Sequence, residues 1–438
     1  MTASDYPEAP QPPAGAAELR GFVSGWLPVL MVSLTFLSRP MSAAGVPSVV
    51  NFLHFLVCPP MLLLLARWDR LPKDCRRLLG LSGLLFVEIV LSAALNGAGI
   101  INVVLLAVML LEPFLLLAVF SAGIWTEQAI SRFERVFFGC FALNLAMALG
   151  QWALLGLRND EVTGLFLEMG AGAHLSGAFA LLPAAFILAR RDRGTKAMRV
   201  LPMALALGVI KACDSKQVLA AFILGMLLAT LGQLGFTRIR PRVILAAILL
   251  VVSAQIALPV YSPMFRHVFS EDTMLLVLRL KLVGPAIIAR EITNPLQYVF
   301  GIGPGHGFSR LAWLAPVYRE YLEPLGLTES NVFDKVFFIS DNFWLSSHAQ
   351  GSSAFSPLHS YGATLGDLGW CGLALYLATW GLVWRMCADS WIERAVLATA
   401  LVLGVTFMWL EEPPFILCVT GCLGMGWQRR RRKEPVRS

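Results

Sequence analysis

Three side chains that could carry chemistry stand far apart in the sequence: Lys216, Arg279 and His359. A neutral imidazole such as that of His359 can remove a proton from an alcohol. The guanidinium of Arg279 presents a fixed fork of donors to phosphate oxygens, and the ammonium of Lys216 binds them as a point charge. Each also has a structural interpretation: a surface arginine, a lysine whose stem reaches the membrane interface and a packed histidine. The sequence therefore predicts phosphate binding and proton transfer only if the fold brings the three together.

Motifs for other chemistries are missing. The glycine cluster at 301–307 lacks the Lys-Ser/Thr ending of a P-loop, so we interpret it as a tight turn whose amides could also lie near an anion. No pair of histidines has the spacing of a metal site, and no GxSxG nucleophile motif occurs. His54, inside an apolar span, is interpreted as a core residue, and His174 as a structural one. We expect neither a metal nor a cofactor.

The composition is that of a membrane protein. Hydrophobic residues make up 57% of the chain and charged residues only 14%, with a mean hydropathy of +0.68. One water-soluble core could not bury so much apolar surface. The apolar runs do not alternate with polar residues as the strands of a membrane barrel do. The sequence therefore predicts an all-α polytopic membrane protein.

Apolar spans give the predicted layout of about twelve transmembrane helices. Nine lie within 21–263 and three within 361–427. Between them, 264–360 is the one long polar segment, and we expect a large external loop that carries the chemistry. Residues 1–20 are predicted to be a disordered cytoplasmic tail rather than a signal peptide, and 428–438 a basic cytoplasmic tail. The predicted spans are 21–38, 46–66, 78–95, 99–120, 136–155, 174–189, 200–210, 218–236, 243–263, 361–384, 395–410 and 415–427.

Basic residues give the orientation. Most of the 35 Lys and Arg residues fall in the tails and in alternate short connections, on the side that would hold both termini. The positive-inside rule assigns that side to the cytoplasm and the 264–360 loop to the outside. We interpret the RRRRK run at 429–433 as an anchor to membrane lipids, so nucleic acid is not expected as a partner. The eight cysteines fall mostly in spans or on the basic side, and no disulfide is predicted.

The large loop opens with a predicted helix. From Glu271 to Glu291, apolar residues recur with Arg279, Lys281 and Arg290 between them. This pattern is typical of an amphipathic helix that lies along the membrane surface or packs on the bundle. His359 stands at the other end of the loop, just before the next apolar span, where the outer membrane surface is expected.

These features, in this order, resemble the signature region of the O-antigen ligase and polymerase superfamily. The motifs match only in the C-terminal part of the chain, and the rest is similar in hydropathy and topology. Lys216 stands where the family usually has Arg, and Ser360 and His306 stand where Asn is common, which indicates a divergent member. The matching residues are Arg279, Asn294-Pro295, the cluster at 301–305, His359-Ser360-Tyr361 and LGDLGWCGL at 365–373.

The resemblance implies a GT-C-like bundle in the bacterial inner membrane with one large periplasmic loop. It implies a metal-independent inverting glycosyltransferase whose donor is an oligosaccharide on undecaprenyl pyrophosphate. Arg279 and Lys216 would bind the pyrophosphate, and His359 would serve the acceptor hydroxyl as base or orienting group. No cofactor is implied.

Three functions stay open. The acceptor could be another lipid-linked repeat unit, which would make the protein a polymerase of surface polysaccharide or exopolysaccharide with a chain-length regulator as a partner. It could instead be lipid A-core, which would make the protein an O-antigen ligase in lipopolysaccharide biosynthesis. The departures from the family pattern favour the polymerase. A transporter or flippase of lipid-linked sugar is the third alternative, although transporters usually hold their polar sites at mid-membrane on repeated helices.

Overall fold

The described part of the chain is helical throughout. The structure is a computed structural model in which residues 14–66, 71–122, 125–167, 171–190, 195–234, 271–344 and 356–433 are described. Within these ranges the chain forms sixteen α-helices and five short 3-10 helices, with no strand. The prediction of an all-α fold is therefore confirmed for the described residues.

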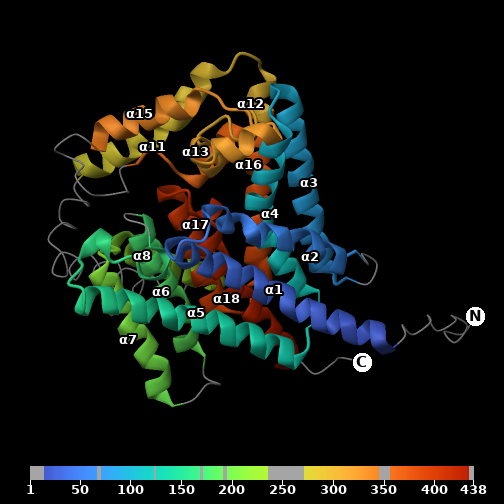
Figure 1. Ribbon diagram of the computed structural model, residues 1–438, viewed down its shortest axis with the longest axis vertical. Coiled ribbons are helices and arrows are strands. Elements are labelled where there is room, and N and C mark those ends of the chain that lie inside the picture. Colours follow the sequence, from blue (N-terminus) through green and yellow to red (C-terminus); the bar gives the residue numbers. More distant parts are fainter. Residues whose placement is uncertain are drawn as a thin grey trace, which may run out of the picture.

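The helices of the N-terminal half form most of the bundle (Figure 1). α3, α4, α5, α6 and the first 18 residues of α8 are long and apolar enough to cross a membrane, which makes this a multi-pass membrane protein. The elements are α1 (Ala14–Ala43), η1 (Ser48–Val57), α2 (Cys58–Leu64), α3 (Lys73–Asn96), α4 (Ile100–Ser121), α5 (Glu127–Ala153), η3 (Asn159–Glu161), η4 (Gly164–Phe166), α6 (Ala171–Ala189), α7 (Lys196–Ala212) and α8 (Lys216–Leu234).

The C-terminal half adds a helical cap and three further bundle helices. α11 has the bounds predicted for the amphipathic helix, and Figure 1 shows α11, α12, α13 and α15 together at the upper end, which we call the capped end. The elements are α11 (Glu271–Glu291), α12 (Leu296–Phe300), α13 (Arg310–Val317), α14 (Arg319–Leu322), η5 (Glu323–Leu325), α15 (Val332–Trp344), α16 (Ser360–Met386), α17 (Trp391–Thr406), η7 (Trp409–Glu411) and α18 (Pro413–Lys433).

Besides shifts at the ends of several predicted spans, two parts of the chain differ from the prediction in kind. Helix α1 begins at Ala14, inside the segment assigned to a tail. The predicted span 46–66 is not one helix but the 3-10 helix η1 followed by α2. Pro59 and Pro60 lack the backbone N–H that a continuous helix would need, so the chain changes its helix type there. The predicted span at 243–263 lies outside the described residues.

Small residues let the bundle helices approach closely. α8 packs along α17, and a Cβ at Gly225 would come 2.3 Å from Oγ1 of Thr399. Likewise a Cβ at Gly424 of α18 would come 2.2 Å from the ring of Phe120 on α4. Transmembrane helices associate through such close backbone contacts, because lipid tails supply little hydrophobic drive between them.

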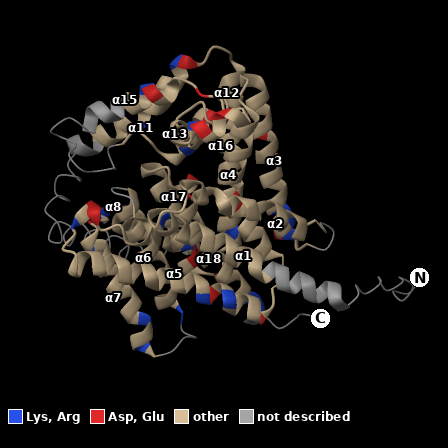
Figure 2. Ribbon diagram, viewed as in Figure 1, with Lys and Arg blue, Asp and Glu red and all other residues tan. Residues whose placement is uncertain are grey.

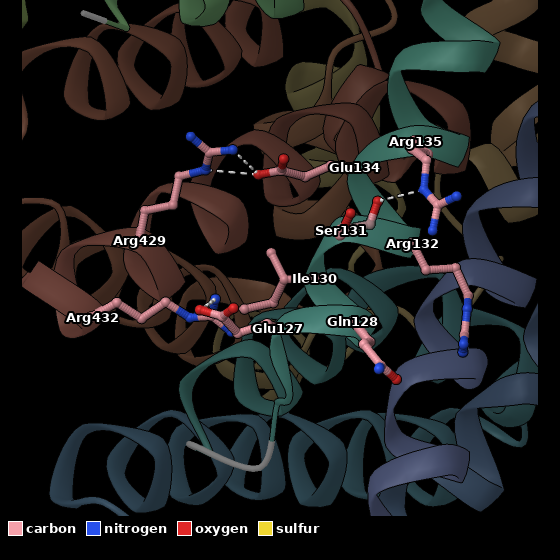
Figure 3. A pocket seen from close by; sticks show the side chains of 9 residues that line it. All are labelled: Glu127, Gln128, Ile130, Ser131, Arg132, Glu134, Arg135, Arg429 and Arg432. Atoms are coloured by element: carbon pink, nitrogen blue, oxygen red, sulfur yellow. Dashed lines mark hydrogen bonds and ion pairs between the residues drawn. The ribbon is translucent and has the colours of Figure 1, made fainter. Parts of the chain in front are cut away.

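Arginines of α18 are tied to α5 at the end of the bundle opposite the cap, which we call the basic end. Figure 2 shows Lys and Arg on α5 and at the lower end of α7. Arg429 donates from Nε to Glu134 at 2.7 Å, and Arg432 lies 2.9 Å from Glu127. These pairs line a cavity of about 640 Å³ (Figure 3). Arg429 and Arg432 of the basic run are thus fixed to α5 as well as suited to anchoring.

Candidate functional site

Polar side chains at the capped end meet at the connection between α17 and α18, residues 406–412. Lys281 of α11 donates to the carbonyl oxygen of Thr406. Ser360, the first residue of α16, donates its backbone N–H to the carbonyl of Phe407 at 3.1 Å, and its Oγ accepts from the N–H of Leu410 at 3.1 Å. This connection therefore joins the cap, α16 and the bundle at one place.

His359 is the N-cap residue of α16. Its Nδ1 accepts from the N–H of Gly362 at 3.1 Å, and its Nε2 lies 3.0 Å from the carbonyl oxygen of Lys281. Because a backbone N–H can only donate, Nδ1 is unprotonated and Nε2 carries the proton. Burial, and then the charge of Lys281, lower the pKa of His359 to about 4. The ring is therefore neutral near pH 7, with both nitrogens occupied.

Lys281 is the cation beside His359, and sequence reasoning missed it in favour of Arg279. Residues two positions apart lie on nearly opposite faces of a helix, since each residue turns the helix by roughly 100°. Lys281 is 7% exposed, and its ammonium donates to the carbonyl oxygens of Ser356, Leu358 and Thr406. Burial lowers the pKa of Lys281 to about 7. Arg279 is exposed on the other face of α11.

Lys216 is the first residue of α8 in the bundle. Its Nζ lies 2.7 Å from Oδ2 of Asp214, which is two residues before it in the chain. Next to them, Nδ1 of His174 is 3.4 Å from Oγ of Ser215. The ring of His174 in turn lies 6.1 Å from that of Phe407, centroid to centroid. The structure thus brings His174 to the α17–α18 connection, whereas Lys216 is bonded to Asp214 and His359 to Lys281 and Gly362.

The glycine cluster forms the tight turn that was predicted. The N–H groups of Gly305 and Gly307 donate to the two carboxylate oxygens of Asp367 at 2.7 and 2.9 Å. Gly301 has a φ of +78°, and a Cβ there would come 2.3 Å from the backbone of Asp367. The anion near these amides is therefore a side chain of α16, which ties the cap to the bundle.

A cleft of about 240 Å³ lies where α13 meets the end of α1 and η1. Glu412 bridges two arginines in its wall: Oε1 accepts from Arg39 at 3.0 Å, and Oε2 lies 2.6 Å from Arg310. Glu411 accepts from the backbone N–H of Arg310 at 2.8 Å. Burial raises the pKa of Glu411 to about 8, so this carboxyl is mostly neutral at pH 7. The aromatic lining consists of Phe52, Phe55, Trp313 and Tyr318.

His54 also lines this cleft, in a pair that the sequence did not indicate. Its Nδ1 is 2.6 Å from Oε1 of Glu112 on α4, and both side chains are almost fully buried. Sequence reasoning treated His54 as a core residue because it falls in an apolar span. The available signal was that a second ionisable residue, Glu112, also falls in an apolar span, and such residues usually face a cavity or a partner.

No family model matches this sequence, and no curated protein matches it.

Proposed function

We propose that this protein is a glycosyltransferase of the bacterial inner membrane that acts at the periplasmic face. In this proposal about twelve helices cross the membrane, both termini are cytoplasmic and the 264–360 segment is periplasmic. The donor is an oligosaccharide on undecaprenyl pyrophosphate, and the most favoured acceptor is another lipid-linked repeat unit of a surface polysaccharide or exopolysaccharide.

One observation carries this proposal: polar groups from three parts of the fold meet at the α17–α18 connection. These groups are the His359–Lys281 pair, His174, which lies beside the Lys216–Asp214 pair, and the cleft of Arg39, Arg310 and Glu412. Cations and imidazoles held together beside apolar helices suit a substrate with a charged head group and a lipid tail. They are the groups that transfer from a sugar pyrophosphate needs.

The reaction needs neither a metal nor a nucleotide in this proposal, because a glycosyl pyrophosphate already carries an activated leaving group. Lys216 and Arg279 would bind the pyrophosphate and stabilise the charge that develops on it. His359 would orient the acceptor region, a role that its two occupied ring nitrogens favour over that of a base. Alignment of the acceptor oxygen behind the anomeric carbon in one displacement predicts inversion of configuration.

The test is deletion of the gene, followed by analysis of the lipid-linked pool and the surface glycan. Accumulation of single lipid-linked repeats supports the polymerase. Long unattached chains would identify the ligase instead. Purified protein given the accumulated lipid-linked oligosaccharide should extend it. If the protein instead moves this lipid across liposome membranes without any transfer, it is a transporter and not an enzyme.

A further inference from the structure

The His54–Glu112 pair has the geometry of a general base. Oε1 of Glu112 lies 2.6 Å from Nδ1 of His54. With Glu112 ionised and the ring neutral, the ring proton is on Nδ1 and the lone pair is on Nε2. Within the described residues, Nε2 of His54 makes no hydrogen bond, and Oε2 of Glu112 is buried without a partner. A carboxylate on one ring nitrogen orients the imidazole and stabilises its protonated form after proton transfer.

The other histidines in the described ranges are engaged differently. Both nitrogens of His359 are occupied by backbone groups. His306 has its nitrogens 3.2 Å from the carbonyl of Ile302 and 2.9 Å from Oγ1 of Thr328. His174 has Ser215 at one nitrogen, 3.4 Å away, and Asp160 at the other, 3.9 Å away. His54 alone among these four combines a carboxylate within hydrogen-bond distance and a place in the wall of a cleft.

The walls of the cleft suit a sugar that carries a negative charge. Among the described residues, its lining includes two guanidinium groups, on Arg39 and Arg310, and one carboxylate, that of Glu412, which pairs with both. A planar guanidinium binds a carboxylate or phosphate through paired hydrogen bonds. Trp313, whose ring lies under the guanidinium of Arg310, and Phe52 also line the cleft, and aromatic rings can pack against a sugar ring.

We propose that this cleft is the acceptor site, that it binds an anionic sugar ring of the acceptor glycan, and that His54 takes the proton of the reacting hydroxyl. This inference rests on the proposed glycosyl transfer and assigns the acceptor side of it. The hydroxyl proton moves to Nε2 of His54 while the acceptor oxygen forms its bond to the anomeric carbon. The bond from that carbon to the pyrophosphate oxygen breaks, and its electron pair leaves with the lipid pyrophosphate. Arg39 and Arg310 bind the anionic substituent, and Glu112 is a positioning residue.

The first experiment measures binding without turnover. Full-length protein in detergent is heated with a methyl uronoside, a hexose phosphate or the matching neutral methyl hexoside, and the unfolding midpoint is recorded. A ligand that binds only the folded state raises this midpoint. We expect the uronoside or the hexose phosphate to raise it more than the neutral sugar, and the better of the two identifies the anionic group. Equal midpoints with all three sugars would overturn the acidic-sugar assignment.

Arg310→Gln should abolish the difference between charged and neutral sugars. Arg319→Gln is the matched control, because Arg319 is an exposed arginine of the neighbouring helix paired with Glu329 and does not line the cleft. The control should respond as the wild type does. If Arg310→Gln keeps the full response, the anion does not bind in this cleft.

The second experiment measures transfer by proteoliposomes with the lipid-linked oligosaccharide that accumulates in the deletion strain. His54→Gln should lower kcat on the order of 10²–10⁴-fold, the usual contribution of a general base. His306→Gln, at a histidine outside the cleft, should retain turnover within a few-fold. Folded His54→Gln protein with wild-type kcat would overturn the role of His54 while leaving the proposed function intact. If wild-type protein transfers nothing, the proposed function fails, and the binding experiment still decides whether the cleft takes an anionic sugar.

Glu112→Gln keeps the inference testable if His54→Gln does not fold. Gln can still accept from Nδ1–H of His54 but cannot stabilise the protonated ring as a carboxylate does. We expect a lower kcat with an unchanged KM and an unchanged response to the charged sugar. A variant that loses only thermal stability, with wild-type kcat per folded molecule, would make Glu112 purely structural and contradict the dyad.

Discussion

Nε2 of His359 donates to the backbone carbonyl of Lys281 across 3.0 Å, and this bond joins the start of α16 to the middle of α11. The other ring nitrogen accepts from the backbone N–H of Gly362. The same imidazole is therefore the N-cap of α16 and a hydrogen-bond donor to α11. Because Nδ1 must be unprotonated to accept from Gly362, the stability of the capped end depends on the protonation state of His359.

Substitution of His359 separates its capping role from its role in transfer. His359→Ala removes the acceptor for the Gly362 N–H and should cost about 1 kcal/mol of stability. His359→Asn provides a new N-cap acceptor and should recover most of that loss, seen as the unfolding midpoint in detergent. Both variants lose the donor to Lys281 and should lose transfer in the proposed reaction. Wild-type transfer by His359→Asn would show that the imidazole is needed only as a cap.

Acid should weaken the contribution of His359 to stability. Its pKa is lowered by burial to about 4 in the folded protein, against an ordinary value of 6.5, so the unfolded chain binds the proton first as the pH falls. The contribution is therefore complete above pH 6.5 and declines between pH 6.5 and 4. The stability difference between wild type and His359→Asn should shift against the wild type over that window, measured by denaturation at stepped pH. A difference independent of pH from 7 to 4 would contradict the buried neutral imidazole.

Lys281 shows what the sequence could not decide. The pattern from Glu271 to Glu291 predicted the helix with its observed bounds, because apolar spacing is a local property. It could not say which cation on that helix faces inward, since this depends on where α16 and α17 lie. Arg279 was selected for its chemistry and its match to a family pattern, yet Lys281 is the residue that contacts His359, through its backbone carbonyl.

Lys281 and Arg279 should therefore respond differently to replacement by Met. Lys281→Met removes the donor to three backbone carbonyls and leaves these acceptors unsatisfied, at about 1–3 kcal/mol in total. Arg279→Met changes an exposed side chain and should leave the unfolding midpoint within about 0.5 kcal/mol of the wild type. In the proposed reaction Arg279→Met raises KM for the lipid-linked donor. If Arg279→Met binds the donor normally, Arg279 is not part of the donor site.

The glycine cluster was partly predictable. Glycine spacing indicated a tight turn, and the positive φ of Gly301, Gly303 and Gly305 agrees with it. The partner of its amides was not predictable, because Asp367 is about 60 residues away in sequence and inside an apolar span. For the same reason His54 and Glu112, in separate spans, gave no local sign of being a pair. Local patterns predicted the elements, whereas the contacts between distant elements required the fold.

Asp367→Asn should loosen the glycine turn. The carboxylate accepts from Gly305 and Gly307 with different oxygens, and an amide can replace only one of them while its NH₂ opposes the other donor. The expected cost is about 1–3 kcal/mol. The rate of limited proteolysis between α12 and α13 should rise as the stability falls. Unchanged proteolysis and stability would mean that the turn does not depend on this anchor.

At the basic end, two ion pairs between the same two helices should differ in strength. Glu134 is 4% exposed and is shared by Arg429 and Arg190, whereas Glu127 lies at the surface with Arg432 (Figure 3). Removal of a buried carboxylate leaves desolvated guanidinium groups without compensation, so Glu134→Gln should cost about 1–3 kcal/mol. Glu127→Gln removes an exposed pair and should cost about 0–1 kcal/mol. Transfer per folded molecule should be unchanged in both, because neither residue lies at the capped end. Equal losses of stability would contradict this argument from burial. Loss of transfer in folded Glu134→Gln protein would show that the two ends of the bundle are coupled.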